Sequence, residues 1–108
     1  MTERGNTTVP IQAPLMEGLQ LRLYIAAGAP NSVRALADLE AIRREYLGSC
    51  CQVEVIDVFQ EPLRALDDGI LLTPTLVRLA PLPVVKIVGD LSDRVRVLQT
   101  LGVPKPTP

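Results

Sequence analysis

Residues 70–76 read Ile70-Leu71-Leu72-Thr73-Pro74-Thr75-Leu76, an apolar run that is broken by a Thr-Pro pair and then resumes. Proline donates no backbone hydrogen bond and disfavours helical geometry in the residue before it. Inside a sheet it is tolerated at the first residue of a strand or on an edge. We therefore expect Pro74 in a turn that enters a strand, with the chain changing direction at this point.

Upstream of the turn, two segments have the pattern of strands. In residues 19–26, leucine or isoleucine occupies every second position from Leu19 to Ile25, which is typical of a strand. Residues 52–58 are rich in the β-branched residues valine and isoleucine and approach a continuous β-branched run, as expected for a central buried strand. The segment between them is long enough for a crossover helix, which predicts a parallel pair.

The helix between these strands is predicted to begin after Pro30, with Asn31 or Ser32 as its N-cap, and to end at Gly48. Its apolar residues follow a spacing of four, three and four, which places them on one stripe that packs on the sheet. The stripe consists of Ala35, Leu39, Ile42 and Tyr46, with Leu36 alongside.

A second, short helix is predicted to open at Pro62 and to end at Asp67-Asp68-Gly69. We expect three of its apolar residues to point inward: Leu63, Leu66 and Ile70. The carboxylate pairs Asp67-Asp68 and Asp90/Asp93 fall where helices end or begin, so we interpret them as caps and helix-dipole partners.

Downstream of the turn, residues 75–79 and 84–88 are predicted to be strands. The connection between them, residues 80–83, is too short for a crossover helix, so the two strands should form an antiparallel hairpin. Ser92 should cap a last helix that ends at Gly102, with Val103 packing behind it. The inward residues expected there are Leu91, Val95, Leu98 and Leu101.

This order, β-α-β-α-β-β-α around a Thr-Pro turn, predicts an α/β, thioredoxin-like fold. The proline of this turn is usually cis in that fold, so we expect cis Pro74. Residues 19–103 should form one domain. Residues 1–18 and 104–108 are polar, proline-containing and aperiodic, and we expect a flexible N-terminal tail and a Pro-rich C-terminal tail.

Composition narrows the possible functions. The net charge of −1 argues against a strong electrostatic grip on nucleic acid or on an anionic membrane. No run approaches the roughly 20 apolar residues needed to span a bilayer, and residues 1–18 lack the pattern of a signal peptide. We therefore expect a cytoplasmic protein. Apolar residues make up 47% of the chain, but only two tyrosines and one phenylalanine are aromatic, so the core should be aliphatic.

The sequence lacks the groups of the common catalytic sites. It contains no histidine, which excludes Cys-His and Ser-His-Asp catalysis and removes the commonest metal ligand. A thioredoxin-type enzyme needs a cysteine in the turn after the first strand, where a helix N-terminus lowers the thiol pKa. That turn holds no sulfur here, and Cys50 and Cys51 lie at the far end of the helix. We expect structural cysteines, no cofactor and no enzyme activity.

Several blocks of the chain closely resemble the KaiB family of circadian clock proteins. They are Leu23-Tyr24-Ile25-Ala26, Ala29-Pro30-Asn31-Ser32-Val33-Arg34-Ala35-Leu36, Val55-Ile56-Asp57-Val58, Ile70-Leu71 with Thr73-Pro74-Thr75-Leu76, and Lys86-Ile87-Val88-Gly89-Asp90-Leu91-Ser92-Asp93-Arg94. The resemblance covers residues 19–101 with hardly a gap. The thioredoxin-like sensor domain of the clock kinase SasA is a weaker relative of the same pattern. Departures such as Glu54, where the family usually has lysine, fit a KaiB-like paralogue.

The resemblance implies a non-enzymatic adaptor that docks on a KaiC-type ring ATPase, modulates its phosphorylation cycle, and sequesters KaiA. It also implies competition with a SasA-like kinase. Carried over by position, the KaiC-facing residues are Asn31, Ser32, Arg34, Asp68, Gly69, Ile70 and Thr73. The strand edge formed by Gln52, Val53, Glu54 and Val55 would bind KaiA. Pro74, Gly89, Asp90 and Ser92 would have structural roles.

Two questions stay open from the sequence. The family is known for switching between the thioredoxin-like form and a tetrameric form with a refolded C-terminal half. Strand propensity in residues 84–88 and the helix stop at Gly102 favour the thioredoxin-like form here, as a monomer or weak dimer. The alternative function is a thioredoxin-fold redox regulator that uses Cys50 and Cys51.

Overall fold

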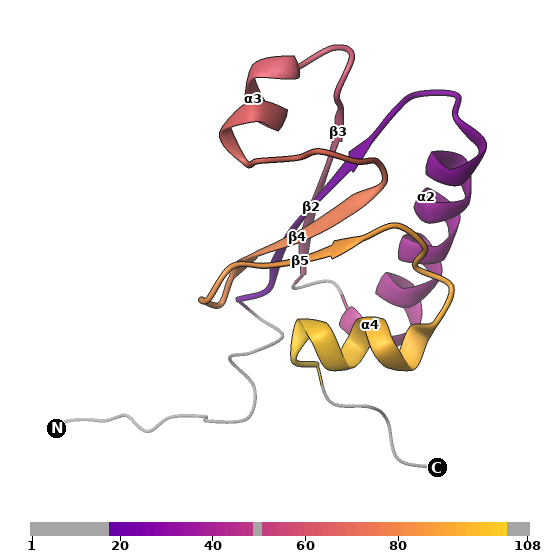
Figure 1. Cartoon of the computed structure of the whole chain (residues 1–108). Coiled ribbons are helices and arrows are strands. Elements are labelled where there is room, and N and C mark those ends of the chain that lie inside the picture. Colours follow the sequence, from indigo (N-terminus) through magenta and orange to yellow (C-terminus); the bar gives the residue numbers. More distant parts are fainter. Residues whose placement is uncertain (1–17, 49–50, 104–108) are drawn as a thin grey trace, which may run out of the picture.

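The computed structural model describes residues 18–48 and 51–103 (Figure 1). In these residues one sheet has the strand order β3-β2-β4-β5. The strands are β2 (Gln20–Ile25), β3 (Gln52–Asp57), β4 (Thr75–Ala80) and β5 (Val85–Val88). β2 pairs in parallel with β3 and antiparallel with β4, and β4 pairs antiparallel with β5. The predicted parallel pair and hairpin are both confirmed.

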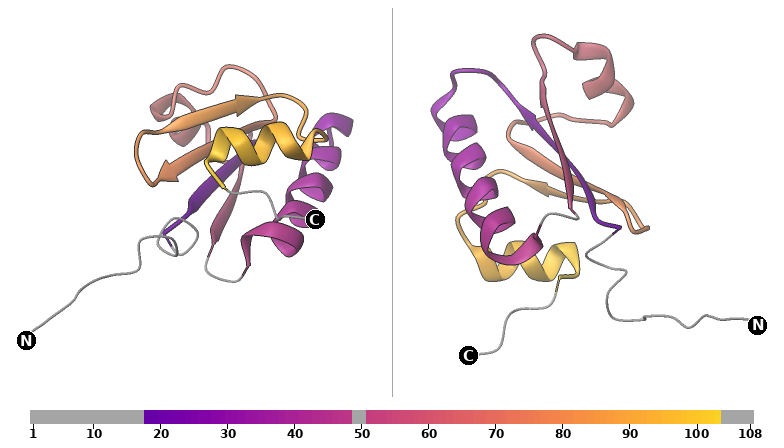
Figure 2. Two further views of the ribbon diagram at one scale, coloured as in Figure 1. Left: turned by 90° about the horizontal axis from the view of Figure 1, so that it is seen from below. Right: turned by 180° about the vertical axis from the view of Figure 1, so that it is seen from behind.

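The helices cover the two faces of this sheet unequally. α2 (Pro30–Ile42), which continues as the π-helical turn η1 (Arg43–Leu47), lies with α4 (Arg94–Leu101) on one face. The short helix α3 (Pro62–Asp67) lies on the other side, near one end of the strands (Figure 2). The order of elements is the predicted one, and the thioredoxin-like fold is confirmed. The predicted tails, apart from Gly18, lie outside the described residues.

The larger core lies between the sheet and the helices α2 and α4, and it is aliphatic as expected. The apolar residues of β2 at odd positions point into it, together with the predicted stripe of α2. Its members include Leu19, Leu21, Leu23, Ile25, Ala35, Leu39, Ile42, Leu47, Leu76, Ile87, Leu91, Val97, Leu98 and Leu101. Tyr46 and Leu36 are partly buried against it.

The smaller core, on the α3 face, consists of Tyr24, Ile56, Ala65 and Val77. The prediction that Leu63 and Leu66 point inward is wrong, because their exposed fractions are 73% and 72%. Ala65 is the inward residue of this short helix. Leu63, two residues before Ala65, and Leu66, one residue after it, are rotated from Ala65 by roughly 200° and 100° about the helix axis, so their side chains point away from the sheet. Ile70 packs against this core, as predicted.

The predicted caps of both long helices are displaced. Ala29, rather than Asn31 or Ser32, is the N-cap of α2, because Pro30 already stands at the first helical position. The buried Ser32 Oγ instead accepts a hydrogen bond of 3.0 Å from the backbone N–H of Ala26. Its hydroxyl therefore fixes the turn that follows β2.

At α4 the N-cap is Asp93, whose Oδ1 accepts from the N–H of Arg96, so the prediction of Ser92 as the cap is wrong. The hydroxyl of Ser92 is bound to Asp90 instead. Val95, expected inward, is 45% exposed, while Val97 is fully buried. Position 97 lies one helical turn before Leu101 and so shares its inward face.

Both predicted helix ends are confirmed, with Gly48 at φ 70° and Gly102 at φ 78°. After Gly102, the N–H of the buried Val103 donates to the carbonyl of Leu98 at 2.9 Å. Arg78, on β4, is buried beneath this end of α4. Its Nη1 donates to the carbonyl of Leu101 and its Nη2 to that of Pro83, each at 2.7 Å. One side chain thus links β4, the hairpin loop and α4.

Pro74 is cis, as predicted, and so are Pro81 and Pro83 in the hairpin loop. The carbonyl of Pro74 accepts from the N–H of Gly89 at 2.8 Å. This bond joins the turn before β4 to the turn after β5, and it brings both beside the first turn of α2.

Candidate partner-binding surfaces

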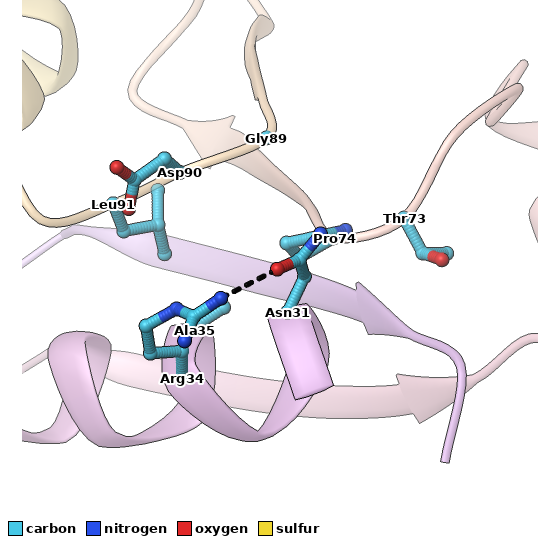
Figure 3. A pocket seen from close by; sticks show the side chains of 8 residues that line it. All are labelled: Asn31, Arg34, Ala35, Thr73, Pro74, Gly89, Asp90 and Leu91. Carbon is cyan, nitrogen blue, oxygen red and sulfur yellow. Dashed lines mark hydrogen bonds between the residues drawn. The ribbon is translucent and has the colours of Figure 1, made fainter. Parts of the chain in front are cut away.

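A cleft of about 210 Å³ lies where the first turn of α2 meets the Thr73-Pro74 turn and the Gly89-Asp90 turn. Figure 3 shows its lining, with Asn31 and Arg34 contributed by α2. Both side chains are exposed, and Arg34 Nη2 donates to Asn31 Oδ1 at 2.7 Å. The bond leaves further guanidinium donors of Arg34 for a partner.

The wall of the cleft opposite α2 is set by hydrogen bonds within the turn after β5. Asp90 Oδ1 accepts from the N–H of Ser92 at 2.9 Å, and Oδ2 accepts from its hydroxyl at 2.7 Å. These bonds hold the pKa of the Asp90 carboxyl below its ordinary value, and the charge of Arg34 adds to the effect. Gly89 has φ 92°, a backbone geometry that favours glycine. The predicted structural residues therefore lie together beside the cleft.

A second hollow shares Thr73 with this cleft and is mostly apolar. Its lining includes Phe59, Leu71 and Leu72, whose exposed fractions are 71%, 92% and 64%. Together with Leu63 and Leu66, they form an unusual concentration of exposed large apolar side chains on α3 and its flanking loops. Exposed apolar groups gathered in one area mark an interaction site more often than isolated ones do.

We call the surface formed by Asn31, Arg34, Phe59, Leu71, Leu72 and Thr73 the docking face. The sequence predicted Asn31, Arg34 and Thr73 for the partner-facing surface, and the structure brings these three together. Ser32, predicted with them, is only 1% exposed and supports the surface from inside. Phe59, Leu71 and Leu72 were missed. Leu71 and Leu72 belong to the apolar run just before Pro74, and this run lies outside any strand or helix that could bury it. That run was the sequence feature from which their exposure could have been predicted.

Asp68, Gly69 and Ile70 border the docking face, but Asp68 makes its polar contacts within the chain. Its Oδ2 lies 2.5 Å from the hydroxyl of Tyr24 and accepts from Arg22 Nη1 at 2.8 Å. Lys86 Nζ donates to its backbone carbonyl. Burial by itself would raise the pKa of Asp68, but the hydrogen bonds from Tyr24 and Arg22 outweigh burial and lower it. Burial and the bond to Asp68 raise the pKa of Tyr24 to about 12.

Gly69 is exposed at φ 68°, and a Cβ added there would lie 3.3 Å from Lys86 Nζ. Ile70 is partly buried in the smaller core. The segment 68–70 therefore anchors α3 to the sheet and positions Leu71 and Leu72 beyond it.

The second predicted surface is the edge of β3, formed by Gln52, Val53, Glu54 and Val55. Within the described chain, β3 pairs only with β2, so its other edge has no strand beside it. Glu54 is engaged on the α3 side of the sheet, where it accepts from Arg64 at 2.8 Å and from Arg22 at 3.3 Å. These bonds, mainly that from Arg64, lower the pKa of Glu54. Val55, on the α2 side, is 46% exposed.

The thiol of Cys51 lies at the start of β3, away from the docking face, and is only 8% exposed. Burial raises its pKa, which disfavours the nucleophilic thiolate. Cys50, the other half of the predicted redox alternative, lies outside the described residues. In the described residues no cluster of three cysteine or carboxylate groups could hold a metal ion. None of the helices there has the length and apolarity to cross a membrane.

The sequence is similar to that of a known protein family. The family model of the KaiB domain matches residues 22–103. The circadian clock oscillator protein KaiB of Trichodesmium erythraeum is 48% identical over 80% of this chain and 83% of its own length. That of Microcystis aeruginosa is 51% identical over 72% of this chain and 75% of its own length.

Solved structures show the same fold. The N-terminal domain of Synechococcus elongatus SasA has a TM-score of 0.66 at 21% identity, covering 95% of this chain and 99% of that domain. Chloroplastic thioredoxin z has a TM-score of 0.65 at 18% identity and covers 80% of each chain. Because the family model spans most of the chain and the curated relatives are about half identical to it, the chain belongs to the KaiB family.

Proposed function

We propose that this protein is a non-enzymatic adaptor that binds a KaiC-type ring ATPase through the docking face and modulates the phosphorylation cycle of that ATPase. The observation that carries this proposal is the content of the cleft beside Pro74. Where a thioredoxin-type enzyme needs a reactive thiol, this chain has Asn31 and Arg34 and no cysteine. The site therefore offers groups that bind, without a nucleophile.

The composition of the docking face supports a protein partner. Arginine and aromatic side chains are enriched at energetically important interface positions. Leu71, 92% exposed, and Phe59 offer apolar area, and Arg34 stands across Thr73 from them. An acidic surface beside an apolar pocket on the ATPase would complement both parts.

A second partner, a KaiA-type protein, would bind along the β3 edge. A strand with an unpaired edge provides backbone donors and acceptors for an added strand, and this mode of recognition depends little on side chains. Membership of the KaiB family motivates the identity of the partner. Glu54 is already paired with Arg64 and Arg22, so it would meet that partner as a partly neutralised carboxylate.

The likeness to the SasA domain supports competition between the two proteins for one site on the ATPase. We place this activity in the cytoplasm, with the protein acting as a monomer or weak dimer. The redox alternative has less support, because the buried Cys51 thiol has a raised pKa and lies away from the cleft.

The test compares two charge reversals on the same helical segment. Arg34→Glu changes the docking face, and Arg44→Glu changes an exposed arginine near the other end, in η1. We expect Arg34→Glu to weaken binding to a purified KaiC-type ATPase by about tenfold or more, because an attractive charge becomes repulsive. Arg44→Glu should leave the affinity within about twofold. Calorimetry or biolayer interferometry gives the affinities.

Circular dichroism checks that both variants fold. Equal affinity of the folded Arg34→Glu variant and the parent would remove Arg34 from the interface. Equal losses in both variants would indicate a general charge effect and would contradict the assignment of the docking face.

A further inference from the structure

A groove of about 340 Å³ runs between α2 and the open edge of β3. We call it the α2–β3 groove. Its lining is mostly apolar, formed by Leu36, Leu39, Cys51, Val53 and Val55, while the ion pair of Glu40 with Arg43 stands on its rim. An apolar groove beside an open strand edge is suited to an extended segment that adds a strand and fills the groove with its side chains.

The backbone of β3 shows which of its residues face this edge. Gln52 and Val58 donate their N–H groups to Leu19 and Ile25 of the β2 segment, so even-numbered residues pair with β2. Because N–H and C=O groups alternate between the two edges of a strand, Val53, Val55 and Asp57 present theirs outward. The side chains of Val53 and Val55 lie on the α2 side and line the groove.

Although the region 1–18 taken as a whole has no regular pattern, residues 9–15 within it alternate with a period of two and match both requirements. They read Val9-Pro10-Ile11-Gln12-Ala13-Pro14-Leu15. Both prolines fall at even positions, and all the odd positions are aliphatic. Consider this segment as an extended strand antiparallel to β3, with the backbone groups of its odd-numbered residues hydrogen-bonded to β3. Every N–H group that faces β3 is then present, and the two positions without an N–H group, Pro10 and Pro14, face solvent. In this arrangement the side chains of the odd-numbered residues lie on the face of the sheet that carries Val53 and Val55. These residues are Val9, Ile11, Ala13 and Leu15.

We propose that residues 9–15 form a detachable edge strand, antiparallel to β3, whose aliphatic side chains fill the α2–β3 groove. The connection has sufficient reach. Gln20 lies beside Gln52, the first residue of β3, so a strand on the open edge ends about two strand spacings, or roughly 10 Å, from β2. The five residues from Leu15 to Gln20 span up to about 17 Å when extended.

The docked segment would cover the same β3 edge that we propose for a KaiA-type partner. It would therefore act as an intramolecular competitor, released when a partner strand binds. Its prolines, directed outward, would also end the sheet and prevent further strands from adding. The proposal concerns the chain alone, so it stands or falls independently of any partner.

Two proline substitutions in the full chain test the proposal. Ala13→Pro removes a donor that faces β3, whereas Gln12→Pro removes one that faces solvent. Amide hydrogen exchange by NMR is measured at Val53, Val55 and Asp57, with Glu54 and Ile56, which face β2, as internal references. We expect Ala13→Pro to speed exchange at the three outward amides by about tenfold or more, as a docked segment that opens locally would allow. Gln12→Pro should leave them within about twofold of the parent.

Thiol accessibility gives a second readout, because Cys51 lines the groove. In a Cys50→Ser background, Ala13→Pro should raise the rate of Cys51 modification, and Gln12→Pro should not. Unprotected outward amides in the parent, or equal responses to the two prolines, would overturn the proposal. Protection that grows with protein concentration would assign the edge to a second copy of the chain and would overturn it as well.

Discussion

Leu71 has the largest exposed fraction, 92%, among the exposed large apolar residues of the described chain, and it lies beside the cleft that Thr73 also lines. The preceding Ile70 is tied into the smaller core and Thr73 lies in the cleft wall, so Leu71 is held at the surface from both sides. An exposed apolar side chain contributes no buried apolar area to the stability of the free domain. Its presence at the surface therefore indicates a bound state in which a partner covers it.

We predict that Leu71→Asp weakens binding to the KaiC-type ATPase by about tenfold or more, since an apolar contact would be replaced by a charge that must be desolvated. The matched control is Leu82→Asp in the hairpin loop, where the parent side chain is 77% exposed. The control should bind like the parent. The affinities come from the titration used for Arg34, and similar losses in both variants would argue against a local contact.

Asp68 makes contacts within the chain that the sequence did not predict. Its position beside Gly69 indicated a helix end, and the resemblance placed it on the partner-facing surface. The structure engages its carboxylate with Tyr24 and Arg22 of β2, 44 and 46 residues away in sequence. Such contacts follow from the packing of α3 on the sheet, and no local pattern announces them.

We predict that Asp68→Asn lowers the free energy of unfolding at pH 7 by about 1–2 kcal/mol, because a charge-assisted network is lost. The folded-state pKa of Asp68 is lowered, so its contribution is complete above the unfolded pKa near 4 and disappears as pH falls through the folded value. Denaturant titrations should therefore show the parent and the variant converging below about pH 4. Asp67→Asn, at the exposed neighbour, is the control and should change stability little at either pH.

At the scale of elements, long periodic segments were predictable and short ones were not. The stripe of α2 and the alternation of β2 were correct because each repeats over several turns or pairs. The six-residue α3 offers one inward position, and sequence could not tell that Ala65, rather than the larger Leu63 and Leu66, would occupy it. The start of α2 lies before Asn31 because Pro30 takes the first helical position. The start of α4 lies one residue later than expected because Asp93, rather than Ser92, accepts the hydrogen bond from the N–H of Arg96.

The end of α4 gives a test of element-level packing. We predict that Gly102→Ala destabilises the fold more than Gly28→Ala does. Both glycines have a positive φ, 78° and 84°, so each substitution should cost roughly 1–2 kcal/mol of backbone strain. Only at Gly102 would the added Cβ meet another group, 3.1 Å from the Arg78 guanidinium that binds the end of α4, whereas nothing lies within 4 Å at Gly28.

Chemical denaturation of the two variants measures this difference directly. A larger loss of stability for Gly102→Ala than for Gly28→Ala would show that Arg78 cannot move aside without cost. Equal losses would mean that the arginine moves aside without cost, and the contact would then be no constraint on the end of the helix.

For the whole molecule, the order of elements and the turn at Pro74 defined the fold from sequence, whereas the docking face required the structure. Phe59 and Leu72 lie 13 residues apart, and only the folding of the loops around α3 places them in one hollow. The α2–β3 groove likewise combines residues from two elements that a sequence pattern treats separately.

The last prediction concerns which form the free chain adopts. Arg78 is 7% exposed, and its guanidinium binds the carbonyls of Leu101 and Pro83, so it stabilises β4, the hairpin loop and α4 in the thioredoxin-like arrangement. β5 pairs with β4 along its length, and Val103 closes the larger core behind α4. A form with a refolded C-terminal half would lose all of these contacts. We therefore predict a thioredoxin-like free protein that is monomeric or weakly dimeric.

NMR secondary chemical shifts should report strand at residues 85–88 and helix at residues 94–101, and light scattering should give a mass near that of one or two chains. Arg78→Met should raise the population of any minor form, because the carbonyls of Leu101 and Pro83 would lose their donor, and the buried one at Leu101 would do so at a cost of about 1–3 kcal/mol. Since two folds of one sequence need differ by only a few kcal/mol, this single change could make the second form visible in slow exchange. A tetramer with helical shifts at residues 85–88 in the parent chain would contradict the prediction.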